Sequence, residues 1–284
     1  MAESVRDGES VDVVIQIAPE DSPMSKTAGR LIEHSVERSR LKIEHVADFE
    51  IRGGRTISVW PTAEAKQKDI EVFLFGPAWA TLCHQRGMLP LHASAIVTKG
   101  GITAFAGYSG AGKSTTAALL HSLGYELVAD DMLPVSFDQN LIPGAWPYLR
   151  RLKLRRDVII QLGFTPAELV SETLDKEKYF VRPKLTGDNI WRRLERLYLL
   201  EDDVTDPHVP IEQITGADAV HALLNQTYHF DFVLGTQRFG DHLAFCTRLA
   251  SKILIYRLRR SPLSDAGKRL GSLICTHLEG AKAS

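Results

Sequence analysis

The chain has 284 residues, of which 44% are hydrophobic and 24% are charged. A chain of this kind can bury a large core, in one large domain or in two small ones. Its 34 basic and 35 acidic residues give a net charge of −1, so bulk electrostatics give no indication of a nucleic-acid partner. The three cysteines are widely spaced and form no C-x-x-C pair, which argues against a disulfide framework or a structural zinc site.

The N-terminus is polar and acidic, and it lacks the features of a signal peptide. The most apolar stretch, Val72 to Leu82, is too short to cross a bilayer, and we expect Gly76-Pro77 to break it. We therefore expect a cytoplasmic protein without a membrane partner. The sequence leaves homo-oligomerisation open.

Residues 1–66 predict a small β-rich module at the start of the chain. The run Val13 to Ile17 is typical of a strand, and residues 49–60 predict a hairpin that turns at Gly53-Gly54. Residues 25–40 are polar with scattered apolar positions, which indicates a weak helix or a loop. A polar junction then leads into a second domain over residues 67–284.

The second domain alternates between predicted strands and predicted helices. Two strands surround the turn at Lys99-Gly100-Gly101, and an Ala- and Leu-rich helix ends at Gly124, where a helix C-cap is expected. We expect strands at residues 93–97, 102–106, 126–129, 133–137, 196–200 and 251–258, and helices at residues 78–86, 113–123, 220–224 and 240–249.

Residues 107–114 read GYSGAGKS, which is a complete G-x-x-x-x-G-K-[ST] phosphate-binding loop between a predicted strand and a predicted helix. In this context the loop N–H groups converge on an anion, and the helix N-terminus adds its positive dipole end. Lys113 can reach the β- and γ-phosphates, and the Ser114 hydroxyl can bind Mg²⁺. We expect ATP to be bound by Gly107, Ser109, Gly110, Ala111, Gly112, Lys113, Ser114 and Thr115.

Phosphoryl transfer also needs a metal carboxylate and a group that takes the acceptor's proton. Asp130 and Asp131 follow a short apolar strand that we expect to neighbour the phosphate-loop strand. Adjacent residues at a strand end point to opposite sides, so one carboxylate can hold Mg²⁺ while the other faces the acceptor. Capping of the following turn is the alternative. Glu201, which also follows an apolar strand, is a rival metal ligand.

Basic side chains offer further candidates for contacts to phosphate or to an acidic peptide. Arg150 and Arg151 open the run RRLKLRR, whose alternation indicates a strand with one charged face. Arg182 lies in a Pro-containing segment that could close over phosphates. For each of them, a solvated surface position is the alternative.

Three segments of the chain resemble the catalytic domain of the HPr kinase/phosphorylase family: Leu91 to Ala95, the phosphate loop, and Leu127 to Asp131. That family has a histidine before the strand, a GDSGVGKS-type loop and an ADD triplet after the helix. The resemblance implies a P-loop α/β catalytic domain with a mixed central sheet and flanking helices. It also implies that Asp131 is the general base, that Asp130 helps to hold Mg²⁺, and that His92 tunes the carboxylates.

One departure from the family bears on the substrate. Bifunctional members carry a glycine-rich RGLGIIN segment that is tied to phosphorolysis and assembly, whereas residues 143–151 here read PGAWPYLRR. The chain is more similar to relatives from lasso-peptide gene clusters, some of which look like kinases for a C-terminal serine of the precursor peptide. The resemblance therefore implies an ATP- and Mg²⁺-dependent serine kinase acting on a peptide or protein, with the N-terminal module positioning the peptide. The alternatives are an HPr(Ser) kinase without phosphorylase activity, a non-catalytic nucleotide-binding regulator and a small-molecule kinase.

Overall fold

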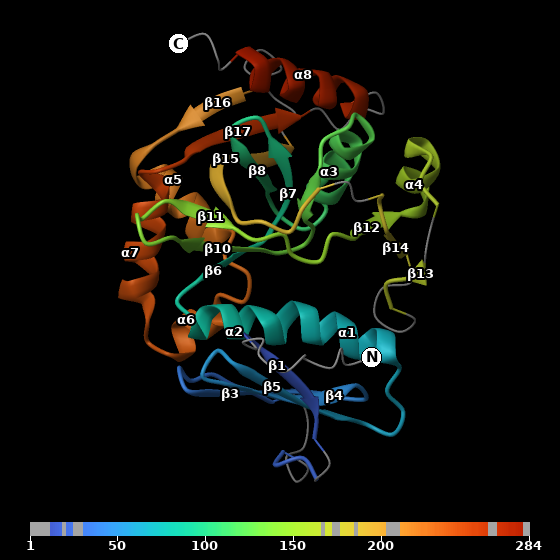
Figure 1. Ribbon diagram of the computed structural model, residues 1–284, viewed down its shortest axis with the longest axis vertical. Helices are drawn as coiled ribbons and strands as arrows, with labels where there is room; N and C mark the ends of the chain where they lie inside the picture. Colours follow the sequence, from blue (N-terminus) through green and yellow to red (C-terminus); the bar gives the residue numbers. More distant parts are fainter. Residues whose placement is uncertain are drawn as a thin grey trace. The chain divides into compact units, whose positions relative to one another are not determined.

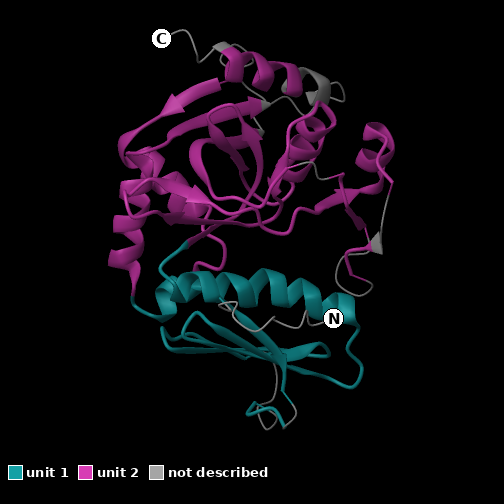
Figure 2. Cartoon of the chain, viewed as in Figure 1, with its two compact units in different colours: residues 1–88, 231–237 teal, residues 89–230, 238–284 magenta. Residues whose placement is uncertain are grey.

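The computed structural model describes residues 12–18, 21–24, 31–165, 168–171, 177–184, 187–202, 211–260 and 266–280. The chain divides into two compact units (Figure 2). Unit 1 comprises residues 1–88 and 231–237, and unit 2 comprises residues 89–230 and 238–284. Unit 1 thus extends beyond residue 66, the boundary expected from the sequence, because the helices that follow this residue pack against the N-terminal sheet.

Unit 1 contains a five-stranded sheet with the strand order β1-β5-β4-β3-β2 among its described residues. The predicted hairpin is confirmed, with both turn glycines, Gly53 and Gly54, at positive φ. The prediction of a weak helix or loop is wrong at residues 31–33 and 38–40, which are strand, and its loop alternative is confirmed at residues 34–37. Residues 25–30 lie outside the described residues. The strands are β1 (Val14–Ile17), β2 (Leu31–Glu33), β3 (Arg38–Ile43), β4 (Ala47–Arg52) and β5 (Thr56–Pro61).

A helical stretch covers one face of this sheet (Figure 1). It passes through Gly76-Pro77 as a π-helical segment instead of breaking there, so the interruption expected from the sequence is absent from this described stretch. Leu74, Ala78 and Leu82 are buried from its inner side against the sheet. The helices of unit 1 are α1 (Gln67–Phe73), the π-helix η1 (Leu74–Ala78), α2 (Trp79–Gln85) and α6 (Asp231–Gly235).

Unit 2 is built on a curled mixed sheet, so the predicted α/β fold class is confirmed (Figure 1). Its main path is β6-β10-β11-β15-β8-β7-β9, and β17 pairs with both β15 and β16. The described strands of this sheet are β6 (Leu89–Leu91), β7 (Ala93–Thr98), β8 (Gly101–Ala106), β9 (Leu127–Ala129), β10 (Leu133–Phe137), β11 (Pro143–Ala145), β15 (Arg192–Asp202), β16 (Ile211–Ile214) and β17 (Leu254–Arg260).

The two faces of the central strands carry separate cores, because successive strand residues point to opposite sides. Leu197 and Leu199 of β15 belong to the core beneath α5 and α7, whereas Tyr198 and Leu200 belong to the core beneath α3 and α8. The flanking helices are α3 (Lys113–Ser122), α5 (Gly216–Asn225), α7 (Phe239–Ala250) and α8 (Ala266–Gly280).

A separate three-stranded sheet, with the order β12-β14-β13, completes the described part of unit 2. Its elements are β12 (Leu152–Arg155), α4 (Arg156–Leu162), β13 (Glu168–Leu169) and β14 (Lys178–Val181). The alternation predicted for the basic run is confirmed in β12, where Leu152 and Leu154 are buried while Lys153 and Arg155 alternate with them on the other side.

Candidate functional site

The phosphate loop leaves the sheet at the end of β8 and leads directly into α3, as predicted. Gly107 adopts φ +147°, and a Cβ atom there would lie 2.6 Å from the Leu200 carbonyl oxygen. Only glycine lets the loop turn away this close to β15. Gly110 and Gly112 also have positive φ, so the loop backbone folds around the space in front of the helix.

Lys113 is buried at the first residue of α3. Its Nζ donates hydrogen bonds to the carbonyl oxygens of Gly107, at 2.9 Å, and Tyr108, at 3.1 Å. Burial lowers the pKa of the Lys113 amine, although the nearby charges of Asp131 and Asp130 oppose this effect. The amine is therefore held over the loop by main-chain groups, which an incoming phosphate oxygen can replace.

Asp130 is buried at the end of β9, where both of its carboxylate oxygens accept hydrogen bonds. The Ser94 hydroxyl donates to Oδ1 at 2.6 Å, and the Lys153 main-chain N–H donates to Oδ2 at 2.8 Å. Burial raises the pKa of Asp130, while these bonds and one with the Ser114 side chain lower it. The contact with Ser114 joins the carboxylate to the phosphate loop.

Asp131 has φ +75°, which is uncommon for a residue other than glycine. Lys153 Nζ lies 2.7 Å from Oδ2, and His92 Nδ1 lies 3.9 Å from Oδ1. Burial would raise the pKa of Asp131, but the charge of Lys153, with those of His92 and Lys113, brings it below its usual value. The side chain is therefore a carboxylate at neutral pH.

His92 lies between the aspartates and the end of α5. Its Nδ1 donates a hydrogen bond of 2.9 Å to the Asp131 carbonyl oxygen, which can only accept, so Nδ1 carries the proton. Burial, followed by the charge of Lys113, lowers the pKa of His92 and favours the neutral ring. The main-chain N–H of His92 donates to the Gln226 carbonyl oxygen at 2.7 Å, while Gln226 Oε1 accepts from Gly107 N–H at 2.9 Å.

The strand that carries Asp130 and Asp131 does not neighbour the phosphate-loop strand, which corrects the prediction. β7 lies between β8 and β9 and is antiparallel to both. Since two antiparallel steps restore the original direction, β8 and β9 still end at the same edge of the sheet. The aspartates therefore reach the phosphate loop across one intervening strand.

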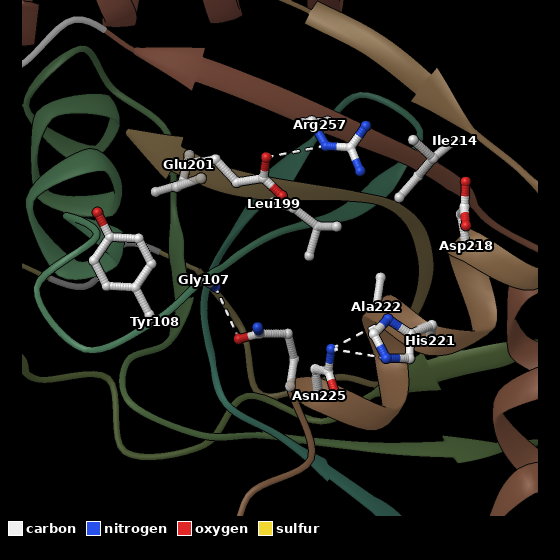
Figure 3. A pocket seen from close by; sticks show the side chains of 12 residues that line it. Gly107, Tyr108, Leu199, Glu201, Ile214, Asp218, His221, Ala222, Asn225 and Arg257 are labelled. Carbon is white, nitrogen blue, oxygen red and sulfur yellow. Dashed lines mark hydrogen bonds and ion pairs between the residues drawn. The ribbon is translucent and has the colours of Figure 1, made fainter. Parts of the chain in front are cut away.

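Glu201, the rival metal ligand, lies near the end of β15, which is directly paired with β8. Its carboxylate lies 3.0 Å from Arg257 Nε, on a pocket wall (Figure 3). The carboxylate with a bond to Ser114 is that of Asp130.

The basic run contributes a residue that the sequence did not single out. Arg150 is 3.0 Å from Glu126, the guanidinium carbon of Arg151 lies 3.9 Å from the Phe180 ring centroid, and Arg182 is exposed just after β14. The residue of this run that contacts the aspartates is Lys153, whose Nζ pairs with Asp131 and whose main-chain N–H donates to Asp130. Its place in the alternation of β12, opposite the buried leucines, was the available signal. Ser94 and Gln226 had no comparable signal, because their contacts cross from one element to another.

The donor set of this site fits a polyphosphate with Mg²⁺. Loop N–H groups and the Lys113 amine suit phosphate oxygens, while the Ser114 hydroxyl and the Asp130 carboxylate are oxygen ligands of the kind that Mg²⁺ prefers. The remaining loop residues sit as a cradle requires. Ser109 and Gly110 are exposed at its tip, Ala111 is buried beneath it, and Thr115 is half-buried in the first turn of α3.

Comparisons with known proteins give matches among solved structures only. No protein-family model matches the chain, and no curated protein matches it. Among solved structures, the HPr(Ser) kinase/phosphatase from Coxiella burnetii is similar with a TM-score of 0.37 and 14% identity, over 68% of this chain and 99% of that one. Within the described residues, no helix combines the length and the apolar character needed to span a bilayer.

Proposed function

We propose that this protein is a kinase that transfers the γ-phosphate of ATP to a serine hydroxyl of a peptide or protein. One observation carries the proposal: Lys113, Ser114, Asp130 and Asp131 converge at one edge of the sheet. Nucleotide binding alone requires one metal carboxylate, whereas this edge holds two carboxylates in different environments. A second carboxylate beside the phosphates is what transfer to a hydroxyl requires.

In the donor half of the site, the loop N–H groups and Lys113 bind the phosphates. Lys113 then exchanges its hydrogen bonds with Gly107 and Tyr108 for bonds to phosphate oxygens. Ser114 and Asp130 would hold Mg²⁺, which neutralises phosphate charge when it is bound. Ser94 and the Lys153 N–H fix the Asp130 carboxylate, so little reorganisation is needed.

In the acceptor half of the site, Asp131 takes the proton of the serine hydroxyl. Lys153 keeps this carboxylate ionised before the acceptor arrives, and His92 holds the Asp131 main chain through its Nδ1–H. Arg150, Arg151 and Arg182 are assigned no step here. Their proposed contacts to phosphate or peptide remain predictions that single Arg→Ala variants can test through the peptide KM.

For the acceptor we propose the C-terminal serine of a ribosomally made, lasso-type precursor peptide. The support is the sequence resemblance over residues 89–135 together with the departure at residues 143–151 from the RGLGIIN segment. The N-terminal unit would then position the peptide. A variant lacking residues 1–66 should raise the peptide KM and leave ATP binding intact; loss of folded protein would instead assign this region a structural role.

Phosphate transfer from γ-labelled ATP, measured beside ATP binding, tests the kinase proposal. Lys113→Ala should weaken both ATP binding and transfer, whereas Asp131→Asn should slow transfer about 10²–10⁴-fold and leave ATP binding nearly intact. ATP binding without transfer to any serine peptide or to HPr would leave a nucleotide-binding regulator or a small-molecule kinase. Transfer to HPr alone would identify an HPr(Ser) kinase.

A further inference from the structure

A pocket of about 260 Å³ opens beside the phosphate loop (Figure 3). It lies between α5 and the ends of β8, β15 and β17, and both Gly107 and Tyr108 line it. From the geometry we infer that this pocket holds the nucleoside of the phosphate donor. The inference rests on the proposed function, and it assigns the part of ATP that the phosphate loop does not bind.

Continuity with the loop is the first argument. Gly107 belongs to the loop and to the pocket, and its N–H is tied to Gln226, another lining residue. A group bound in the pocket is therefore close enough to the loop to belong to the same ligand as the phosphates that the loop holds. Its volume lies below the roughly 300–1,000 Å³ of sites that enclose a whole ligand, so it suits one ring-bearing moiety.

The chemistry of the lining is the second argument. Leu199, Ile214 and Ala222 give the pocket an apolar wall. On α5, Asp218, His221 and Asn225 supply hydrogen-bonding groups, and Figure 3 shows their side chains along one flank of the pocket. An apolar surface with a few polar groups at one side is what a heteroaromatic base with its ribose requires.

Charge excludes the other obvious occupants. The pocket is lined by the carboxylates of Glu201 and Asp218, and its Arg257 is already bonded to Glu201 at 3.0 Å and to Glu212 at 3.4 Å. Phosphate or a peptide carboxyl terminus would meet the Asp218 carboxylate there, and Arg257 is already shared between two glutamates. Ribose hydroxyls and base amino groups are neutral donors that carboxylates accept.

Calorimetric titration of the full chain with ATP and with inorganic triphosphate, both with Mg²⁺, tests the assignment. Ala222→Leu fills the pocket, and Asn225→Ala removes a polar lining group at an exposed position. We expect Ala222→Leu to raise the Kd for ATP at least about tenfold, equivalent to about 1.4 kcal/mol, and to change the Kd for triphosphate less than about twofold. Ala217→Leu, exposed on the same helix outside the pocket, is the matched control and should change neither.

An unchanged ATP affinity in Asn225→Ala and in Ala222→Leu overturns the inference, as does an equal loss for ATP and triphosphate. If Ala222→Leu does not fold, Asn225→Ala and Asp218→Ala decide in its place by the same ratio of affinities. A raised peptide KM at constant ATP affinity would assign the pocket to the acceptor and overturn the inference. If the wild-type chain binds no ATP, both the proposed function and this inference fail. If Lys113→Ala abolishes ATP binding while the pocket variants leave it unchanged, only the assignment of the pocket is rejected.

Discussion

The ends of β9 and β15 look alike in the sequence, since both are apolar strands that run into acidic residues, yet they occupy different environments. At the end of β9, Asp130 and Asp131 are held by Ser94, Lys153 and the phosphate loop. At the end of β15, Glu201 pairs with Arg257 on the wall of an open pocket. β15 is directly paired with β8 and β9 is not, so adjacency to the phosphate-loop strand does not decide which carboxylate serves the phosphates.

The difference shows what makes a carboxylate suitable for the metal or for the acceptor. Asp130 receives two hydrogen bonds that orient it toward Ser114, and Asp131 receives a lysine that keeps it ionised. The Glu201 carboxylate forms an ion pair with Arg257 and is half-exposed. Neighbours from other elements, which the local sequence does not reveal, set these roles.

Removal of one carboxylate from each strand end should have the largest effect that separates the two sites. Asp131→Asn should lower kcat about 10²–10⁴-fold, the usual contribution of a general base, because the amide cannot take the serine proton. Glu201→Gln is the matched variant and should leave kcat within about tenfold of wild type, since it lies outside the proton path. Steady-state phosphate transfer measures both. Equal losses would mean that β15 carries a catalytic carboxylate.

A smaller effect is expected from the group that orients Asp130. Ser94→Ala removes the donor to Oδ1 and should raise the Mg²⁺ concentration for half-maximal transfer about 10–100-fold, as loss of supporting partners does at other metal sites. Thr98→Val, at the opposite end of β7, provides the control. A Mg²⁺ dependence that is the same in Ser94→Ala and wild type would show that Asp130 does not hold the metal.

The ion pair at the end of β15 should matter little for stability. Arg257 and Glu201 are both partly exposed, at 27% and 44% of their side chains, so solvent screens their attraction. Arg257→Met should reduce the free energy of unfolding by about 1 kcal/mol or less in a denaturant titration. A loss of several kcal/mol would instead mean that this ion pair contributes substantially to folding stability, which contradicts the account.

We expect the stability of the protein to depend slightly on pH through His242 of α7. This side chain is buried and hydrogen-bonded at 2.9 Å to Thr227, just beyond α5. Burial lowers the pKa of His242 in the folded protein. In the unfolded chain this histidine has a pKa of about 6.5, so the unfolded chain takes up a proton at a higher pH than the folded protein does. The stability that is present above this pH is therefore lost as the pH falls through the folded-state pKa. Thermal unfolding should show a smaller loss of Tm between pH 7.5 and acidic pH in His242→Gln; an identical loss would contradict this assignment.

Features set by local chemistry were predictable from the sequence. The glycines of the phosphate loop and the Gly53-Gly54 turn impose their backbone shapes directly, and the leucines of β12 alternate as a strand requires. The π-helical passage through Pro77 was not predictable, because packing of Leu74, Ala78 and Leu82 on the sheet outweighs the local interruption. The placement of β9 beyond β7 depends on pairing between distant segments. The contact between Lys153 and Asp131 likewise depends on where β12 lies relative to β9.

The most direct test of the central claim is intact-mass spectrometry of serine-ended precursor peptides and of HPr after incubation with ATP and Mg²⁺. The wild-type protein should add the mass of one phosphate to a peptide, and Asp131→Asn should add none while still binding ATP. Transfer by Asp131→Asn at the wild-type rate, or no transfer by a wild-type protein that binds ATP, would contradict the assignment of this edge of the sheet to phosphoryl transfer.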